Sequence, residues 1–256
     1  SFIPHSEYIK NPVQFFPAKL TLTNYSYIID NCNLVSSYFN SIVNMVLSVS
    51  YGLLCTVCMG YALSFKNVPG QRLVYIYMVI TMFFSGGLLP DYLLAKNLGL
   101  INTRWAVILW GGLGVSNVFI IRNNIENLPL ELREAAYMDG AGEITTFTRV
   151  ILPLLKPTIA TFTLFFAVAN WNDYFWPMLM LQSNELRTLP LMLRSLIIND
   201  SIDTSKYNAN ITEELRVFSE GIKMAGVVMT MLPIMCVYPF LQKHFAKGML
   251  VGSVKL

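Results

Sequence analysis

The chain has 256 residues, of which 54% are apolar and only 13% are charged, and its mean hydropathy is +0.51. A soluble globular domain carries about 25% charged residues, so this composition predicts an integral membrane protein. The net charge of +3 comes from scattered basic residues and gives no electrostatic basis for binding nucleic acid. The aromatic content of 13% excludes an intrinsically disordered chain.

Uncharged stretches mark the expected membrane spans. A membrane-crossing helix needs about 17–25 mostly apolar residues. Backbone groups in lipid must be paired within the segment, and strict alternation is absent, so helices are predicted rather than barrel strands. We expect five spans, near residues 38–64, 73–96, 105–122, 157–182 and 221–243.

The N-terminal segment, residues 1–37, is polar and aromatic and has no signal-peptide pattern. In the first span, Cys55 and Cys58 have the spacing of a redox pair, but no βαβ pattern surrounds them. Both are predicted to be small apolar residues on one helix face. Because His5 and His244 are far apart in the sequence, no histidine metal site is expected.

The second and third spans contain residues that interrupt or crowd a helix. Ser85–Pro90 places a glycine pair and a proline at the end of the second span. Gly111–Gly114, in the third, lacks the lysine and hydroxyl pair of a phosphate-binding loop, so we interpret its glycines as sites of close helix packing. Asn117 is a candidate to line a polar path.

The most charged stretch, residues 122–156, predicts a helix–turn–helix on a membrane face. A first helix is expected from Leu128-Pro129, where the missing proline N–H costs no hydrogen bond. It should end at Asp139-Gly140, because glycine adopts a left-handed conformation easily. A second short helix is expected over residues 142–150, and two prolines then bend the chain back into the membrane.

The fourth span contains amides, a carboxylate and aromatic rings. Such residues are tolerated at membrane depth only where they meet protein or a water-filled cavity. Aromatic faces stack on sugar rings, and amides and carboxylates bind sugar hydroxyls, so the composition suits a sugar path. The alternative is that the aromatics anchor the helix at the outer interface. The candidate path residues here are Asn170, Trp171, Asn172, Asp173, Tyr174 and Trp176.

Residues 183–220 are expected to form an external surface loop with short helices, and residues 244–256 a short basic tail. Basic residues divide equally between the two sides of the membrane, so their distribution does not set the orientation. If the tail is cytoplasmic, the five expected spans place the N-terminus outside. We therefore expect a first helix that precedes this sequence.

One motif in the charged stretch is specific. Glu134-Ala135-Ala136 is followed after three residues by Gly140, and after nine more by Val150-Ile151-Leu152-Pro153. This pattern resembles the EAA loop of ATP-binding-cassette (ABC) importer permeases, with Val150 at an isoleucine position. The resemblance implies a coupling helix that docks into a groove of an ATPase subunit. The coupling residues it implies are Glu131, Glu134, Ala135, Ala136, Asp139, Gly140, Leu152 and Pro153.

Two further segments narrow the resemblance. Residues 242–255 are similar to the tail of maltose-type carbohydrate permeases, and Phe83–Pro90 with Lys96–Leu100 resembles a branch that transports complex oligosaccharides. The resemblance implies a type I ABC importer transmembrane domain with six helices, five of them present here, spanning residues 38–243. It places the chain in the bacterial cytoplasmic membrane, with residues 122–156 and the tail in the cytoplasm.

The resemblance also implies partners. A second homologous permease, a pair of ATPase subunits that bind ATP and Mg, and an external sugar-binding lipoprotein would complete the importer, while this chain would hold no catalytic residue, cofactor or metal. Three alternatives remain open. These are an importer for another polar solute such as an amino acid or phosphonate, an ion-driven secondary transporter, and a membrane hydrolase. The last two are disfavoured because the sequence has no internal repeat, no histidine within a span and no His-Glu-x-x-His motif.

Overall fold

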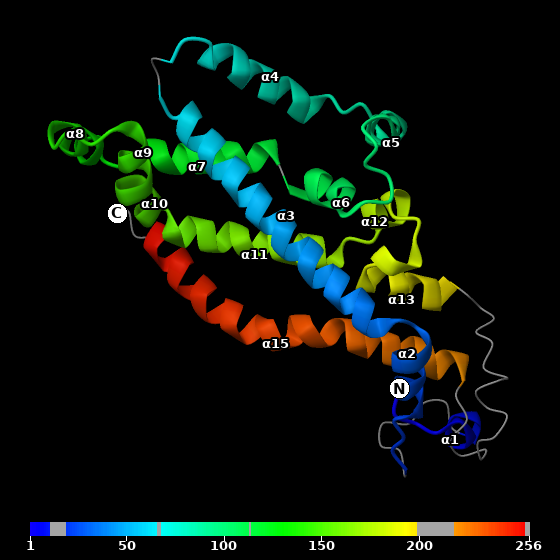
Figure 1. Cartoon of the computed structure of the whole chain (residues 1–256). Coiled ribbons are helices and arrows are strands. Elements are labelled where there is room, and N and C mark those ends of the chain that lie inside the picture. Colours follow the sequence, from blue (N-terminus) through cyan, green and yellow to red (C-terminus); the bar gives the residue numbers. More distant parts are fainter. Residues whose placement is uncertain (11–18, 66–67, 113, 199–217, 254–256) are drawn as a thin grey trace. The chain divides into compact units, whose positions relative to one another are not determined.

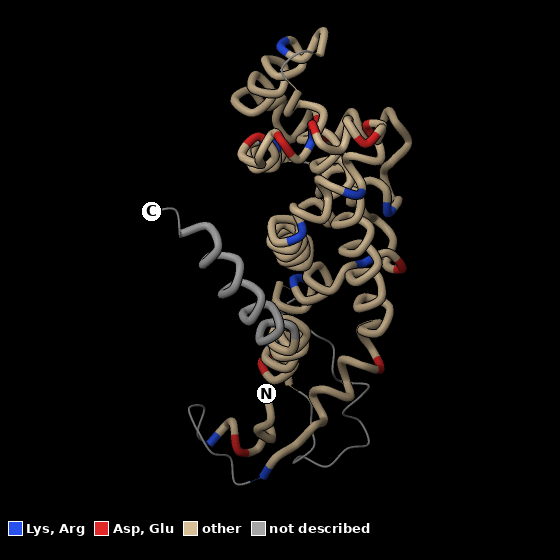
Figure 2. The backbone as a smooth tube through the Cα atoms, turned by 90° about the vertical axis from the view of Figure 1, so that its left-hand side faces the viewer, with Lys and Arg blue, Asp and Glu red and all other residues tan. Residues whose placement is uncertain are grey.

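The computed structural model describes residues 1–10, 19–65, 68–112, 114–198 and 218–253, with the side chains of the last helix described up to Cys236. Every regular element in this part of the chain is helical, as expected (Figure 1). Charged positions are few along the apolar helices (Figure 2). Within the described ranges, two helices are long and apolar enough to cross a membrane alone, and counting three bent helix pairs as spans gives up to five.

The chain begins with α1 (His5–Lys10), α2 (Thr23–Asn31) and α3 (Leu34–Leu63). The α3 helix has 30 residues and no charged side chain, so it is about 45 Å long, more than the ~30 Å thickness of a bilayer core. It covers residues 38–63 of the first expected span and extends that span by four residues at the N-terminal end.

The second expected span consists of two helices, α4 (Gln71–Phe83) and α5 (Leu88–Asn97), and the chain bends by 120° between them. The break lies at the glycine pair singled out in the sequence. Gly87 has φ +88°, which residues with a Cβ rarely adopt, and it directly precedes α5. The interruption expected at Ser85–Pro90 is therefore confirmed.

The third expected span is also divided, into α6 (Arg104–Gly112) and α7 (Val115–Glu126), where the sequence predicted one continuous helix. Gly114 is extended rather than helical, so part of the glycine run breaks the helix. Close packing does hold for Gly111, because a Cβ there would lie 2.7 Å from Oδ1 of Asn170. Packing alone was too simple an interpretation of these glycines.

The rest of the chain forms shorter helices and one long one. These are α8 (Glu131–Met138), α9 (Glu143–Thr145), the π-helix η1 (Thr146–Ile151), α10 (Leu152–Leu154), α11 (Lys156–Asn172), α12 (Phe175–Met180), the 3₁₀-helix η2 (Asn184–Leu186), α13 (Leu189–Ile198) and α15 (Ser219–Ser253). The segment Glu143–Leu154 meets α11 at 76°. The fourth expected span is interrupted between α11 and α12, inside the polar segment predicted to break it.

Contacts divide the chain into two compact units. The first unit comprises Ser1–Val43 and Trp171–Phe240, and its fully buried apolar residues include Ile28, Met180, Leu189 and Ile222. The second comprises Asn44–Asn170 and Leu241–Leu256. Its main core joins α3, α7, η1 and α11 through Val49, Val57, Ile121, Ile125, Ile151, Leu155, Phe162 and Phe166.

Candidate functional site

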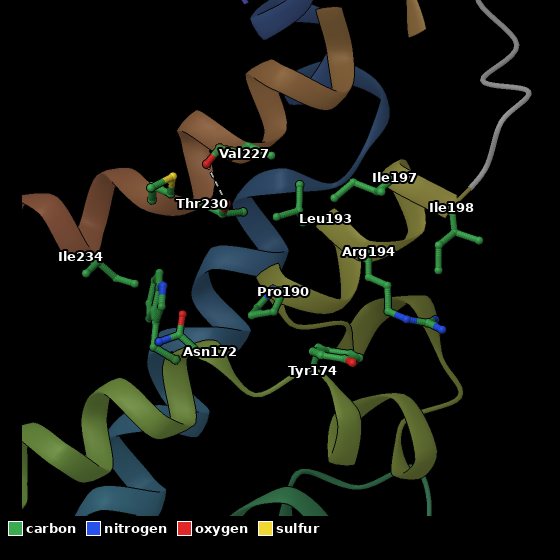
Figure 3. A pocket seen from close by; sticks show the side chains of 12 residues that line it. Asn172, Tyr174, Pro190, Leu193, Arg194, Ile197, Ile198, Val227, Thr230 and Ile234 are labelled. Atoms are coloured by element: carbon green, nitrogen blue, oxygen red, sulfur yellow. Dashed lines mark hydrogen bonds between the residues drawn. The ribbon is translucent and has the colours of Figure 1, made fainter. Parts of the chain in front are cut away.

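A cavity of about 480 Å³ lies within the first unit, between the end of α11, α13 and α15 (Figure 3). Small-molecule sites commonly measure about 300–1,000 Å³, so this cavity is large enough to hold part of an organic ligand. Its wall is mostly apolar, with a few polar groups. The lining residues are Trp171, Asn172, Tyr174, Pro190, Leu193, Arg194, Ile197, Ile198, Val227, Thr230, Met231 and Ile234.

Trp171 forms a fixed aromatic part of this wall. Its side chain is only 7% exposed, and its ring centroid lies 6.4 Å from that of Tyr38 at the start of α3. The Tyr38 hydroxyl in turn donates a hydrogen bond to the carbonyl of Met229 in α15. Because the aromatic pair is tied to two helices, the face of Trp171 is held in place before any ligand arrives.

The polar groups of the cavity come from three elements. Asn172 follows Trp171 at the end of α11, and Thr230 lies on α15, where its hydroxyl donates to the Val227 carbonyl at 2.8 Å. Arg194 of α13 faces Tyr174, with its guanidinium carbon 5.9 Å from the ring centroid (Figure 3). None of the described lining residues is acidic. The cavity thus offers two aromatic faces, an amide, a hydroxyl and one cation.

Three of the seven predicted path residues, Trp171, Asn172 and Tyr174, meet at this cavity. Asp173 instead accepts hydrogen bonds from the backbone N–H groups of Phe175 (3.0 Å) and Trp176 (3.4 Å), so it caps the start of α12. The Trp176 ring packs edge-on against Phe175 with centroids 5.9 Å apart.

The other two predicted path residues belong to the second unit. The Asn170 amide donates to the Phe166 carbonyl at 2.8 Å and lies against Gly111. Asn117, in the first turn of α7, has its amide beside Gly114. Both side chains therefore serve local packing around the α6–α7 break.

Arg194 was missed from the sequence because residues 183–220 were interpreted as an external loop. Much of that stretch, residues 199–217, lies outside the described residues. The signal that could have found the residue is the apolar run of α13, Leu-Pro-Leu-Met-Leu-Arg-Ser-Leu-Ile-Ile, which contains a single charge. An isolated arginine in such a run needs a polar environment, and a solute path supplies one.

The helix–turn–helix predicted in residues 122–156 is present at the end of α7 (Figure 1). Gly140 has φ +77°, and the N–H of Ala141 bonds to the Ala136 carbonyl at 2.9 Å while the N–H of Gly140 bonds to that of Tyr137 at 3.0 Å. These two bonds form a Schellman motif, which ends α8 as the sequence predicted. The helix begins at Glu131, two residues after Pro129.

The predicted coupling residues of this segment differ in how exposed they are. Ala136 is buried and packs inward, whereas Pro153 is exposed and Leu152 is half-buried. Two large apolar side chains beside them are also exposed, Met138 at 87% and Ile144 at 80%. The remaining predicted coupling residues are all exposed, namely Glu131, Glu134, Ala135, Asp139 and Gly140.

The second arm of the helix–turn–helix is not the regular α-helix that the sequence predicted. In place of a short α-helix it forms α9, the π-helix η1 and α10. Pro153 explains the wider turn, because its ring would crowd the carbonyl of Arg149 in a regular α-helix. The arm is anchored by Ile151, which is fully buried in the core of the second unit.

Comparisons with known proteins agree with these features. The chain is 41% identical to Protein LplC of Bacillus subtilis (strain 168) over 255 residues, which cover 100% of this chain and 86% of LplC. It is 34% identical over 258 residues to the polygalacturonan/rhamnogalacturonan transport system permease protein YtcP of the same organism, covering 100% of this chain and 89% of YtcP.

A solved structure has the same fold. The crystal structure of a bacterial ABC transporter involved in the import of the acidic polysaccharide alginate contains a chain that superposes with a TM-score of 0.88 at 30% identity. The match covers 95% of this chain and 86% of that one. The expected all-α fold of a type I ABC importer is thereby confirmed.

The family model that matches residues 26–251 describes the binding-protein-dependent transport system inner membrane component. The match extends over most of the chain and includes both the cavity and the helix–turn–helix. This chain therefore belongs to that family, as a bacterial membrane permease of an ABC importer whose ATP is hydrolysed by a separate subunit.

Proposed function

We propose that this chain forms half of the translocation path of an oligosaccharide importer and that the cavity of the first unit binds the sugar. The observation that carries the proposal is the fixed Trp171 face beside Asn172 and Tyr174. Sugar rings have apolar C–H faces that stack on aromatic rings, and their hydroxyls bind amides. The relatives named above as sugar transporters support the same substrate class.

The cation in the cavity supports a narrower substrate class. A guanidinium binds a carboxylate through two parallel hydrogen bonds, and stacking on an aromatic ring holds its plane in position. Arg194 has the aromatic partner Tyr174, and no acidic residue is among the described lining residues. We therefore propose that the sugar carries uronic acids, like the polygalacturonan and alginate handled by two of the relatives.

The coupling role is proposed for α8 and the turn that follows it. Its exposed acidic residues and small Ala135, with the apolar Met138 and Ile144 beside them, form a surface suited to a groove on an ATPase subunit. Closure of two ATPase subunits around ATP and Mg would move two such helices. One would belong to this chain and the other to a second, non-identical permease, while an external sugar-binding lipoprotein would deliver the substrate.

Transport by the complete importer tests the substrate proposal. The two permeases, the ATPase and the binding protein are reconstituted in liposomes, and ATP-dependent uptake of trigalacturonate is compared with uptake of the neutral galactotriose. We expect trigalacturonate to be imported and Arg194→Gln to lower its uptake about tenfold. Equal uptake of both sugars, unaffected by Arg194→Gln, would refute the uronic acid assignment. Import of neither sugar, with ATP hydrolysis unresponsive to both, would refute binding of such sugars at this cavity.

A further inference from the structure

A polar cluster in the second unit connects the EAA segment to the end of α3 and has no part in the sugar cavity. We call it the Glu143 cluster, and it consists of Tyr61, Arg133, Tyr137 and Glu143. The Tyr61 hydroxyl, in the last turn of α3, donates to Glu143 Oε2 at 2.9 Å. The Tyr137 hydroxyl, in α8, donates to Glu143 Oε1 at 2.7 Å. One carboxylate therefore joins two helices.

Arg133 strengthens the same connection. Its guanidinium carbon lies 4.1 Å from the ring centroid of Phe65 and 5.9 Å from that of Tyr61, so the cation of α8 stacks on the end of α3 and the residues that follow it. Its Nε is buried and has no hydrogen-bond partner among the described residues. The Tyr61 ring also contacts Phe147 of η1, with centroids 4.6 Å apart.

The α8 helix has few other anchors. Within this fully described helix, Ala136 is the buried residue, and the other side chains are half-buried or exposed. Movement of α8 under a docked partner therefore passes along the chain into α7, and through the Schellman turn, Ala136 and the Glu143 cluster. Among the side-chain contacts of α8, those of the cluster lead to α3, the long apolar helix.

We propose that Tyr61, Tyr137 and Glu143 are positioning residues that transmit movement of the coupling helix α8 to the membrane helix α3. This inference rests on the coupling role proposed above for α8. When the ATPase closes, the two hydrogen bonds to one carboxylate make α8 and the end of α3 move together. Burial raises the pKa of Tyr137, as does its hydrogen bond to Glu143, against an opposing effect of Arg133.

The surroundings of the cluster separate this role from core packing. A cavity of about 340 Å³ opens beside Tyr61, Phe65 and Glu143, and the Glu143 side chain is exposed. Removing one hydroxyl, or replacing one carboxylate oxygen with an amide nitrogen, leaves no void in the core around Ile121 and Ile151. The variants Tyr61→Phe, Tyr137→Phe and Glu143→Gln are therefore expected to fold.

The experiment measures how many ATP molecules the reconstituted importer hydrolyses for each sugar imported. Tyr61→Phe and Glu143→Gln are expected to lower uptake about tenfold, with ATP hydrolysis within about twofold of the wild type. The double variant should be no worse than the worse single variant, because both changes weaken the same contact between the Tyr61 hydroxyl and the Glu143 carboxylate. Glu126→Gln is the matched control, since Glu126 pairs with Arg122 at 2.8 Å outside the cluster, and its ratio should stay unchanged.

Two outcomes would overturn the inference. Uptake and ATP hydrolysis that fall together, leaving their ratio unchanged, would show a role in folding or assembly alone. Additive effects in the double variant would show that Tyr61 and Glu143 act separately. Failure of the proposed docking is detected independently by Met138→Cys, whose exposed thiol should crosslink to the ATPase in the wild-type background. Absence of that crosslink would remove the coupling role of α8 itself.

Discussion

The turn at Gly140 offers a graded test of the EAA segment, because the expected cost there comes from the backbone alone. Gly140 has φ +77°, and a Cβ built on it would meet nothing within 4 Å. Replacement therefore adds no steric clash with neighbours, only the strain of a left-handed residue, which costs about 1–3 kcal/mol. Asparagine tolerates this conformation best, alanine less well, and β-branched valine least.

We expect sugar uptake to fall in the order Gly140→Asn, Gly140→Ala, Gly140→Val. The last variant should lose about 5–150-fold if the strain of about 1–3 kcal/mol is taken from the stability of the turn. Gly142→Ala is the matched control, since Gly142 has φ −75° and equally open space. The assay combines uptake by the reconstituted importer with the amount of ATPase that copurifies. Equal losses for Gly140→Asn and Gly140→Val, or a comparable loss for Gly142→Ala, would refute the conformational argument.

Three further predictions concern the cavity and the helix contacts. Trp171→Ala should lower uptake about fivefold by removing an aromatic contact worth about 1 kcal/mol, while ATPase copurification stays unchanged; full recovery in Trp171→Phe would favour a simple anchoring role. Arg194→Lys should retain part of the trigalacturonate uptake that Arg194→Gln loses, because lysine keeps the charge but not the planar pair of donors. Gly60→Val should lower the melting temperature of the purified permease, because a Cβ at Gly60 would lie 2.6 Å from Ile121 and 3.2 Å from the backbone nitrogen of Arg122. Such overpacking costs about 1–3 kcal/mol. An unchanged melting temperature would contradict the close α3–α7 contact.

Features governed by local rules were predictable from the sequence. The uncharged runs gave the apolar helices, and the turn at Gly140 followed from glycine's access to positive φ. The break before α5 followed from the glycine pair in the same way. Each of these outcomes depends on a few neighbouring residues, so one sequence is enough to infer it.

The interpretation of Gly111–Gly114 was incomplete because glycine has two opposite uses in a membrane helix. It permits close approach of another segment, as at Gly111 against Asn170, and it weakens the helix, as at the extended Gly114. Which use applies depends on what packs opposite each glycine. The sequence of the segment alone does not show which residue that will be.

Contacts between residues that are distant in the chain could not be predicted from the sequence. Tyr61 and Glu143 are separated by 82 positions, and no periodicity or motif connects them. Glu143 is one of the nine variable residues between Gly140 and Val150 of the EAA pattern, so the resemblance did not single it out either. Its role becomes visible only once α3 and α8 are seen to share its two carboxylate oxygens.

The two anchoring arrangements in this chain suit two different tasks. The cavity proposed to bind the sugar has an aromatic wall held in place, because Trp171 is buried and Tyr38 ties its surroundings to α15. The proposed coupling helix α8 is instead mostly exposed and held by a few directional bonds. A surface that docks a moving partner cannot be buried, so it requires polar contacts to the membrane helices in addition to buried apolar anchors such as Ile151. A carboxylate that accepts from two phenols meets this requirement with three side chains.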